Sequence, residues 1–414
     1  MAVSTPGAGA EIGSIQIPDG VTLHVRGGST LRAAVDPDAY ATSQYNCLIE
    51  SHGTSGIGIT GQGVIDGRGR DFMEADLRYI YQPKEWRPRL IGFYGATDVR
   101  VRDVTLRNSP SWTLHPAGCR RVNIEGITID NDLKIPNCDG IDPDRCHDVR
   151  ISNCVISSAD DCIVIKNTRD FPQYGDTRRI TVTGCTLVST SAAVKVGTES
   201  VTDFADIEVT GCVISDSSRG IALQLRDQGN IERVIASNCT ISTRLFEEHY
   251  WGRAEPISIT ALPRFSVDGE DRPEWNRDNR VGTIRDVTIH NIRARGENGL
   301  VVYGISRADG SSTVENIRLT NVDLTVERLT RWPAGRRDLR PCDALGGAFR
   351  DPSQDPGLEA LPHNAISIEG TSRVSLSDVS INWRVDGLEG YGTPIHVKNN
   401  AGLVLDRLTV GDLP

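Results

Sequence analysis

The chain has 414 residues and a formal net charge of −10, and this acidic balance argues against nucleic acid or an anionic membrane surface as a partner. No apolar run is long enough to span a bilayer as a helix, and the first residues lack the basic start and apolar core of a secretory signal. We therefore expect a cytoplasmic protein, or a secreted one whose leader has been removed, of unknown oligomeric state.

Strands are predicted along the chain by a repeated pattern, V-x-I-x-x-[VIC]-x-I, in which apolar and polar residues alternate. Alternation at period two, with β-branched residues and with Asn or Gly at the break, is typical of strand–turn–strand units. Copies of the pattern begin at Val99, Val122, Val149, Ile180, Ile207, Val234, Val287, Ile317, Val374 and Leu403. A repeat of this length indicates a solenoid, and the strand-only unit predicts an all-β parallel β-helix.

A third short strand is predicted after each copy of the pattern, and these strands should stack into one parallel sheet about 4.8 Å apart. They cover residues 138–142, 160–166, 192–197, 219–225, 256–260, 300–304, 365–370 and 394–398. Residues that lie far apart in the sequence then become lateral neighbours on adjacent coils.

Three segments interrupt this rhythm and are predicted to leave the coil as loops: 168–178, 246–280 and 327–362. Long loops in a compact fold are usually functional or disordered. Because the repeat crosses every candidate boundary, we expect a single domain over residues 1–414. Solenoids escape the usual limit on domain size, since their core grows in one dimension.

The ten cysteines raise the question of disulfides. Cys154, Cys185, Cys212 and Cys239 occupy the same position of the repeat, and Cys119 and Cys146 share another. Because Cys packs as a small hydrophobe, we expect a stacked ladder of free thiols inside the coil. Such a ladder fits a reducing compartment and does not exclude export.

Three carboxylates recur one coil apart. Segment 137–142, with the sequence N-C-D-G-I-D, carries Asp139, and the next coil carries Asp160 and Asp161. Stacking should bring the three within several Å, where mutual repulsion should leave one of them protonated. A protonated carboxyl beside two ionised ones is the equipment of an inverting glycoside hydrolase, in which the acid protonates the leaving oxygen and the base activates water. The competing interpretation is that these side chains only cap turns.

These motifs resemble the polygalacturonase family, glycoside hydrolase family 28. The similar stretches are I-T-G-Q-G-V-I-D-G-R-G from Ile59, N-S-P-S-W-T-L-H-P from Asn108, N-C-D-G-I-D-P-D-R-C from Asn137 and S-A-D-D-C-I-V-I-K from Ser158. The resemblance covers about Ile57 to Val234. It implies a right-handed parallel β-helix and an inverting mechanism, with Asp160 as the general acid and with Asp139 and Asp161 activating the water.

The sequence departs from the family at two motifs. The family's G-H-G should fall near residues 191–193, where this chain has S-A-A, and its R-I-K should fall at 222–224, where it has A-L-Q. Because the family uses those cations to bind the uronate carboxylate, the departure makes polygalacturonic acid an unexpected substrate. It implies a neutral sugar, or an anionic sugar held by other residues.

Further substrate-binding candidates lie on the coils around the trio: Trp112, His115, Asn137, Lys166, Lys195, Glu199 and Gln224. An aromatic face can stack on a sugar, a histidine or glutamine can bind hydroxyls, and a lysine can also lower a carboxyl pKa. Structural roles compete: core packing for Trp112, a solvated strand end for the lysines and an ordinary turn for Glu199. Asp142 and Asp144 are interpreted as structural turn residues.

Three hypotheses of function remain open. The first is an inverting hydrolase of an oligo- or polysaccharide that needs no metal or cofactor, and that is exo-acting if the loops close one end of its groove. The second is a β-helix polysaccharide lyase, with Ca²⁺ on the carboxylates and Lys195 as the base; no matching Arg is found on the neighbouring strands. The third is a non-catalytic glycan-binding β-helix, against which the spacing of the three acids argues.

Overall fold

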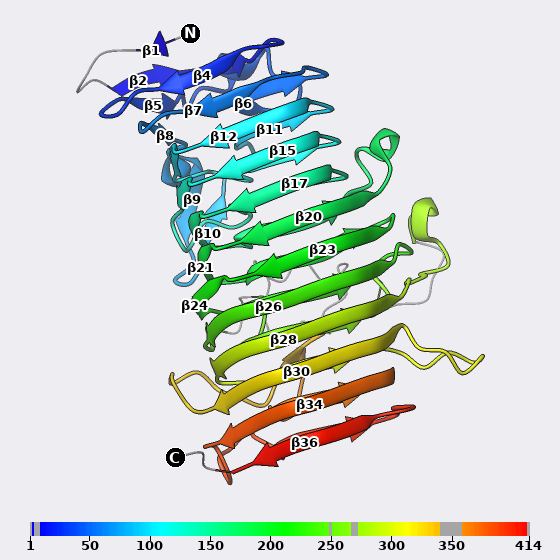
Figure 1. The fold of residues 1–414 in the computed structure, drawn as a ribbon. Helices are drawn as coiled ribbons and strands as arrows, with labels where there is room; N and C mark the ends of the chain where they lie inside the picture. The colour runs from blue at the N-terminus through cyan, green and yellow to red at the C-terminus, as the bar shows by residue number, and fades with distance from the viewer. Residues whose placement is uncertain (1, 4–8, 248–250, 266–271, 340–357, 412–414) are drawn as a thin grey trace. The chain divides into compact units, whose positions relative to one another are not determined.

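The computed structural model describes residues 2–3, 9–247, 251–265, 272–339 and 358–411. Within these residues, regular structure consists of strands and four short 3-10 helices. The chain forms two compact units, residues 1–189 and 190–414, and each is described by itself. In both units strands of successive coils pair in parallel (Figure 1), which confirms the all-β parallel β-helix. The single-domain organisation stays a prediction.

The first sheet of the unit 1–189 carries the repeated pattern. Its main strands are β4 (Thr22–Val25), β7 (Gly58–Thr60), β12 (Thr97–Arg102), β15 (Arg120–Glu125), β17 (His147–Ser152) and β20 (Thr177–Thr183). Val99 pairs with Val122, Val122 with Val149, and Val149 with Ile180. All four side chains are buried, so each coil adds one apolar rung to the core, as the repeat predicts.

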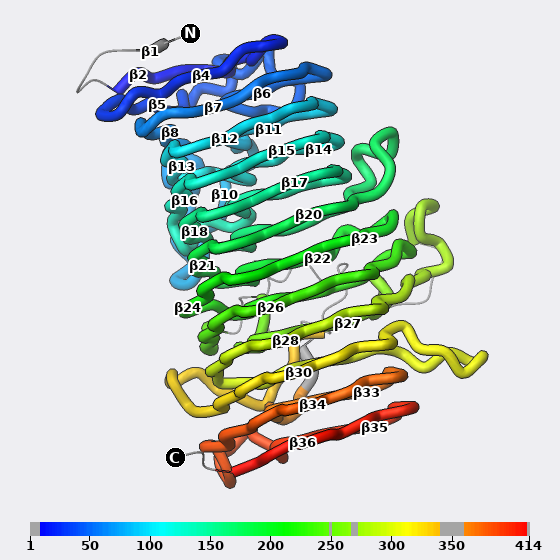
Figure 2. The backbone as a smooth tube through the Cα atoms, in the orientation of Figure 1, coloured from blue at the N-terminus to red at the C-terminus, as the bar shows by residue number. Residues whose placement is uncertain are grey.

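The second sheet of this unit follows the turn in each coil. Figure 2 shows its strands one after another: β5 (Thr30–Ala33), β8 (Val64–Asp66), β13 (Thr105–Arg107), β16 (Thr128–Asp130), β18 (Val155–Ser158) and β21 (Thr186–Ser189). Leu106 pairs with Ile65 on one side and Ile129 on the other. This sheet forms a second wall of the same apolar core.

The third sheet carries the acidic motifs. It contains β3 (Ile15–Gln16), β6 (Cys47–His52), β11 (Arg89–Tyr94) and β14 (Leu114–Ala117), and β19 (Ile163–Asn167) follows two coils after β14. The strand predicted at 138–142 is wrong in detail, since that coil is joined to its neighbours only by isolated bridges. Asn137 has a left-handed φ of 56°, and Pro143 has no N–H to donate. The strand predicted at 160–166 begins only at Ile163.

The unit 190–414 repeats the arrangement. Its pattern-bearing strands are β23 (Phe204–Thr210), β26 (Ile231–Thr243), β28 (Ile284–Gly296), β30 (Val314–Val326), β34 (Ser372–Trp383) and β36 (Val404–Val410). Ile207, Val234, Val287, Ile317 and Val374 pair in that order. The other long sheet contains β22 (Ala192–Ser200), β25 (Arg219–Leu225), β27 (Glu255–Ala261), β29 (Leu300–Tyr303), β33 (Ile366–Glu369) and β35 (Ile395–Lys398), which confirms the third strands predicted there.

Only some of the three predicted loops are loops in the structure. Segment 168–178 leaves the coil, contains the 3-10 helix Pro172–Tyr174 and buries Phe171. Segment 246–280 is not one loop, because β27 lies inside it; the P-I-S-I-T pattern had already predicted that strand. Half of segment 327–362, residues 340–357, lies outside the described residues. The described part contains β31 (Arg337–Asp338) paired antiparallel with β32 (Leu358–Glu359).

The cysteines of the described residues are free and buried. Cys154 and Cys185 interact in the unit 1–189, as do Cys119 and Cys146, and Cys212 interacts with Cys239 in the unit 190–414. The expected interior thiols are therefore confirmed for these residues, while Cys342 lies outside the described part. No helix among the described residues has the length and apolarity needed to cross a membrane.

Candidate active site

Backbone hydrogen bonds hold the acidic segments in register on three successive coils. The amide of Thr113 donates to the carbonyl of Asp139 at 2.8 Å, and the amide of Gly140 donates to the carbonyl of Asp161 at 2.9 Å. Ile141 bridges to Leu114 on one side and to Ile163 on the other. Asp139 and Asp161 therefore lie at neighbouring positions of adjacent coils, as the one-coil spacing predicts.

The three predicted acids meet at one point. Asp139, Asp160 and Asp161 each offer a carboxylate oxygen, and these oxygens all lie within 4.8 Å of one another. All three residues are buried, with exposed fractions of 3%, 8% and 0%. Asp160 is the most accessible of them. Carboxylates this close in a poorly solvated place repel one another, so the site can hold protons as well as charges.

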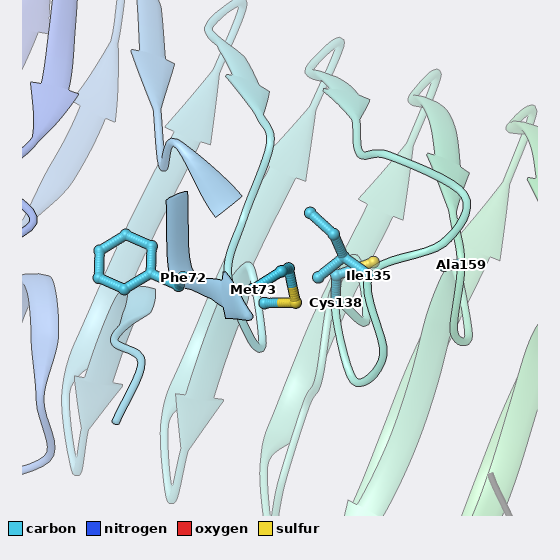
Figure 3. Packing of buried hydrophobic residues seen from close by; sticks show 5 residues of the cluster. All are labelled: Phe72, Met73, Ile135, Cys138 and Ala159. Atoms are coloured by element: carbon cyan, nitrogen blue, oxygen red, sulfur yellow. The ribbon is translucent and has the colours of Figure 1, made fainter. Parts of the chain in front are cut away.

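An apolar cluster anchors the chain on which the trio stands (Figure 3). Cys138 and Ala159, which immediately precede Asp139 and Asp160, pack with Phe72, Met73 and Ile135. Polar contacts complete the anchor, since the Ser158 hydroxyl and the Asn131 amide both donate to the carbonyl of Cys138. The acids therefore stand on a rigid base rather than on a free loop.

Lys166 is buried beside the trio rather than solvated at a strand end. Its exposed fraction is 4%, and its Nζ lies 2.9 Å from Asp139 Oδ2 and 3.1 Å from Asp142 Oδ1. The same nitrogen lies 3.9 Å from the centre of the Trp112 ring. The structural interpretation of a solvated lysine is therefore wrong, because the ammonium faces carboxylates within ion-pair distance.

Asp142 is more than a turn residue. It has no exposed surface, and neither carboxyl oxygen makes a well-directed hydrogen bond with the described residues, although Oδ1 is in close contact with Lys166. Burial raises the pKa of Asp142 well above its ordinary value, the ammonium of Lys166 opposes this, and the charge of Asp139 adds to it. The structure thus places beside the trio a buried carboxyl with a raised pKa, at a residue that sequence reasoning assigned to a turn.

Trp112 and His115 lie one coil before the trio, where Trp112 is partly exposed and His115 is buried. Lys166 and Arg89 both lie over the Trp112 ring, and His115 packs edge-on against it. His115 has no exposed surface, and burial lowers its pKa to about 4. Direct contact of His115 with a sugar is therefore unsupported, because the ring lies beneath the site.

The His115 ring instead connects two charged side chains. Its Nδ1 lies 3.2 Å from the Arg89 guanidinium and its Nε2 lies 3.4 Å from Asp144. Asp144 also accepts from the amide and hydroxyl of Thr168. This buried chain fixes the ring beside Trp112, so Asp144 also does more than shape a turn.

Arg87 and Arg89 are site residues that sequence reasoning missed. The Arg87 guanidinium donates to the carbonyls of Pro110 and Pro136 and, at 2.7 Å, to the side chain of Asn137. Burial lowers the pKa of Arg87, while Cys138, Asp139 and Asp160 oppose that shift, so the cation lies in the field of the trio. Arg89 had a usable signal, since it stands 23 residues, about one coil, before Trp112. Arg87 lies outside the strand pattern and had none.

The other predicted substrate-binding residues lie just before the trio in the sequence, on β22 and on β25. Asn137 is exposed and is held by Arg87. Lys195 and Glu199 lie on β22 and are partly buried, and Gln224 lies on β25 with an exposed fraction of 4%. Lys195 pairs with Ala222, and Gly197 pairs with Gln224. Roles in substrate binding stay predictions for these residues.

The trio also meets the distance condition for a metal site, since three carboxylate oxygens lie within 4.8 Å. Hard cations such as Ca²⁺ take six to eight oxygen ligands. Here the Lys166 ammonium already lies against Asp139, which provides part of the positive charge that a metal would supply. The donor set therefore fits a proton-transfer site better than a Ca²⁺ cage.

Stacked parallel coils that bring three buried carboxylates together define a β-helix protein with an acidic cluster. Residues 2–241 match glycosyl hydrolases family 28, and a probable polygalacturonase of Vitis vinifera is 34% identical over 195 residues, which make up 44% of this chain and 38% of that protein. The chain therefore belongs to glycosyl hydrolases family 28. It spans less than half the length of the Vitis relative.

Solved structures share the fold at low sequence identity. An exopolygalacturonase of Thermotoga maritima has a TM-score of 0.59 and 20% identity, covering 78% of this chain and 79% of that one. A family 28 exopolygalacturonase of Yersinia enterocolitica has a TM-score of 0.64 and 14% identity, covering 96% of this chain and 72% of that one. These likenesses confirm the predicted fold, a right-handed parallel β-helix.

Proposed function

We propose that the chain is an inverting glycoside hydrolase in which Asp160 protonates the leaving oxygen while Asp139 and Asp161 activate the attacking water. The observation that carries this proposal is the meeting of three buried carboxylates within 4.8 Å. The general acid has to reach the glycosidic oxygen, and Asp160 keeps the largest exposed fraction of the three. Membership of family 28 supports the same chemistry.

The carboxylates lie closer together than is usual for the acid and base of an inverting enzyme. Inverting enzymes usually separate acid and base by roughly 6.5–9.5 Å and retaining enzymes by roughly 5–5.5 Å, whereas the nearest oxygens here lie within 4.8 Å. One water molecule that donates to two acceptors at about 2.8 Å, along O–H bonds about 105° apart, spans about 4.4 Å between them. Asp139 and Asp161 can therefore share one activated water. Because the oxygens lie this close, the stereochemistry of the product is a sharp test.

The proposed substrate is an oligo- or polysaccharide other than polygalacturonic acid itself. The chain has Ala222, Leu223 and Gln224 at the positions where the family resemblance places its two cations. All three residues are buried on β25. A neutral side chain at these positions offers no charge to a uronate carboxylate, so a neutral sugar, or an anionic sugar held elsewhere, fits better.

We propose exo action because side chains and the loop 168–178 cover the third sheet on the coils that precede the trio, so that a long sugar chain cannot lie there. On β6, β11 and β14 the residues Glu50, Tyr94 and His115 alternate with core residues, yet all are fully buried or nearly so. Phe171, from the predicted loop 168–178, stacks on Tyr94 and packs against His115. A long sugar chain has no open surface there, so the glycan would have to end near the trio.

A screen of neutral and acidic oligosaccharides tests the proposal. We expect new reducing ends, release of short products from a chain end, and no loss of rate with a chelator. Unsaturated product ends together with chelator sensitivity would establish a lyase instead. Binding without turnover on any glycan would favour a non-catalytic β-helix. Random internal cleavage of a long polymer would remove the exo assignment and leave hydrolysis standing.

A further inference from the structure

The Lys166 ammonium is held from three directions. Its Nζ lies 2.9 Å from Asp139 Oδ2, 3.1 Å from Asp142 Oδ1 and 3.9 Å from the centre of the Trp112 ring. The side chains of Lys166, Asp139 and Asp142 are 5%, 4% and 0% exposed. A lysine placed in this way has lost its water and its rotational freedom, so its position relative to Asp139 is fixed by packing.

Asp139 and Asp142 share the Lys166 ammonium, which lies within ion-pair distance of both. A second buried negative charge without well-directed hydrogen bonds is costly. Asp142 has no exposed surface and makes no well-directed hydrogen bond among the described residues. Asp139 also lies in the field of the Arg87 guanidinium. Burial without a well-directed hydrogen bond therefore favours a proton on Asp142.

We propose that Lys166 is the positioning residue of the base: its ammonium holds the Asp139 side chain in place, while Asp142 and the Trp112 ring fix the ammonium. This inference deepens the proposed hydrolase and rests on it for its catalytic meaning. The charged groups around Asp139 in the unit 1–189 are Lys166, Asp142, Arg87, Asp160 and Asp161. Those around Asp142 are Lys166, Asp139 and Arg89.

The first test needs no substrate. Carboxyl carbons of aspartate report protonation directly in a ¹³C NMR titration of the wild-type protein, with assignments from single Asp→Asn variants. We expect Asp142 to stay protonated at a pH at which the exposed Asp170 is ionised. Titration of Asp142 together with Asp170 would overturn the charge assignment. This result stands or falls independently of whether any glycan is hydrolysed.

The second test is the pH profile of kcat/KM for substitutions at Lys166. Loss of an adjacent cation raises a carboxyl pKa by about 1–3 units. In Lys166→Met the acidic limb, the part of the profile in which kcat/KM falls as the pH falls, should therefore move to higher pH by that amount. Lys166→Arg keeps the charge and should return the limb toward the wild-type pH. Lys84→Met, at an exposed lysine that contacts the carbonyl of Asp71, is the matched control and should leave the limb unmoved.

Asp142→Asn separates positioning from mere packing. Asn has the shape and the donor–acceptor pair of a protonated carboxyl, so this variant should keep the acidic limb at its wild-type pH. A shift of the acidic limb of the pH profile in Asp142→Asn would overturn the proposal. So would a folded Lys166→Met protein with lower activity and a lower melting temperature but an unshifted acidic limb. If Lys166→Met does not fold, the pH profile of Asp142→Asn and the NMR titration of the wild type test the proposal in its place. Absence of turnover in the wild type would refute the proposed function but leave the NMR result to judge the charge assignment.

Discussion

Asp160 combines two properties that a general acid needs, closeness to two other carboxylates and the largest exposed fraction of the trio. Its backbone carbonyl accepts from the Ser189 hydroxyl, and its side-chain Oδ1 accepts from the amide of Asp161. A substitution that keeps the shape and removes the proton should therefore spare the fold and impair the chemistry.

We expect Asp160→Asn to lower turnover by at least about 10²-fold, because proton donation by a placed acid contributes that much. Initial rates on the best substrate of the screen give the measurement. Asp170→Asn, the same change at an exposed loop residue, should keep the wild-type rate. Equal rates for Asp160→Asn and wild type would remove Asp160 from its assigned role.

His115 should make stability depend on pH. Burial lowers its pKa to about 4 from 6.5, so the folded protein keeps the ring neutral while the unfolded chain protonates it. The unfolded state then binds more protons between pH 6.5 and 4, and stability falls as the pH falls through this window. The full effect is on the order of 3 kcal/mol.

Denaturant unfolding at several pH values between 6.5 and 4 should show this dependence. In His115→Gln the free energy of unfolding should fall less steeply with decreasing pH. The difference in slope should correspond to the uptake of up to one proton on unfolding. His24→Gln, at an exposed histidine, should keep the wild-type slope. Parallel slopes for His115→Gln and wild type would mean that the buried ring is not neutral in the folded state.

The sequence predicted the acidic trio because one coil of spacing translates directly into lateral contact. It could not predict the burial of Lys166, since nothing in a strand pattern shows which way a side chain at the strand end turns. It also missed Arg87, which precedes β11 and acts through the turn around Asn137. Of the missed residues, Arg87 lies outside the repeat, whereas Arg89 lies on β11 and could have been found from its one-coil spacing to Trp112.

At the scale of the element, the repeat predicted the register of the strands. Val99, Val122, Val149 and Ile180 stack as the pattern aligns them. The prediction failed at 138–142, where three exceptions to regular strand chemistry cluster: a left-handed Asn137, Gly140 and Pro143. This irregular coil is also the one that carries Asp139.

Gly140 allows the close approach of the two acid-bearing coils. A Cβ at this position would lie 2.4 Å from the carbonyl oxygen of Cys162 and 2.9 Å from Ile156 Cγ2. We expect Gly140→Ala to lower the free energy of unfolding by about 1–3 kcal/mol, the usual cost of overpacking. Thermal unfolding measures this loss.

The matched control is Gly27→Ala, where the added carbon would make only ordinary contact at 3.6 Å with Gln62. Its melting temperature should stay close to that of the wild type. A Gly140→Ala protein as stable as Gly27→Ala would show that the coils are not packed as closely as described here.

At the scale of the whole chain, the free thiols report on the integrity of the coils. The nine described cysteines are buried and unbridged, out of ten in the sequence. A thiol-specific reagent should therefore label at most one cysteine in the native protein and all ten after denaturation without reductant. Labelling of several thiols before unfolding would contradict the packed interior, and fewer than ten afterwards would reveal a disulfide.

The most direct test of the central claim is the configuration of the first-formed product, followed by ¹H NMR during rapid hydrolysis of the best substrate. If Asp160 donates the proton while Asp139 and Asp161 activate a water, the new reducing end should appear with the anomeric configuration opposite to that of the cleaved bond. A product of unchanged configuration would contradict the account, because it would require one of these carboxylates to attack the sugar itself.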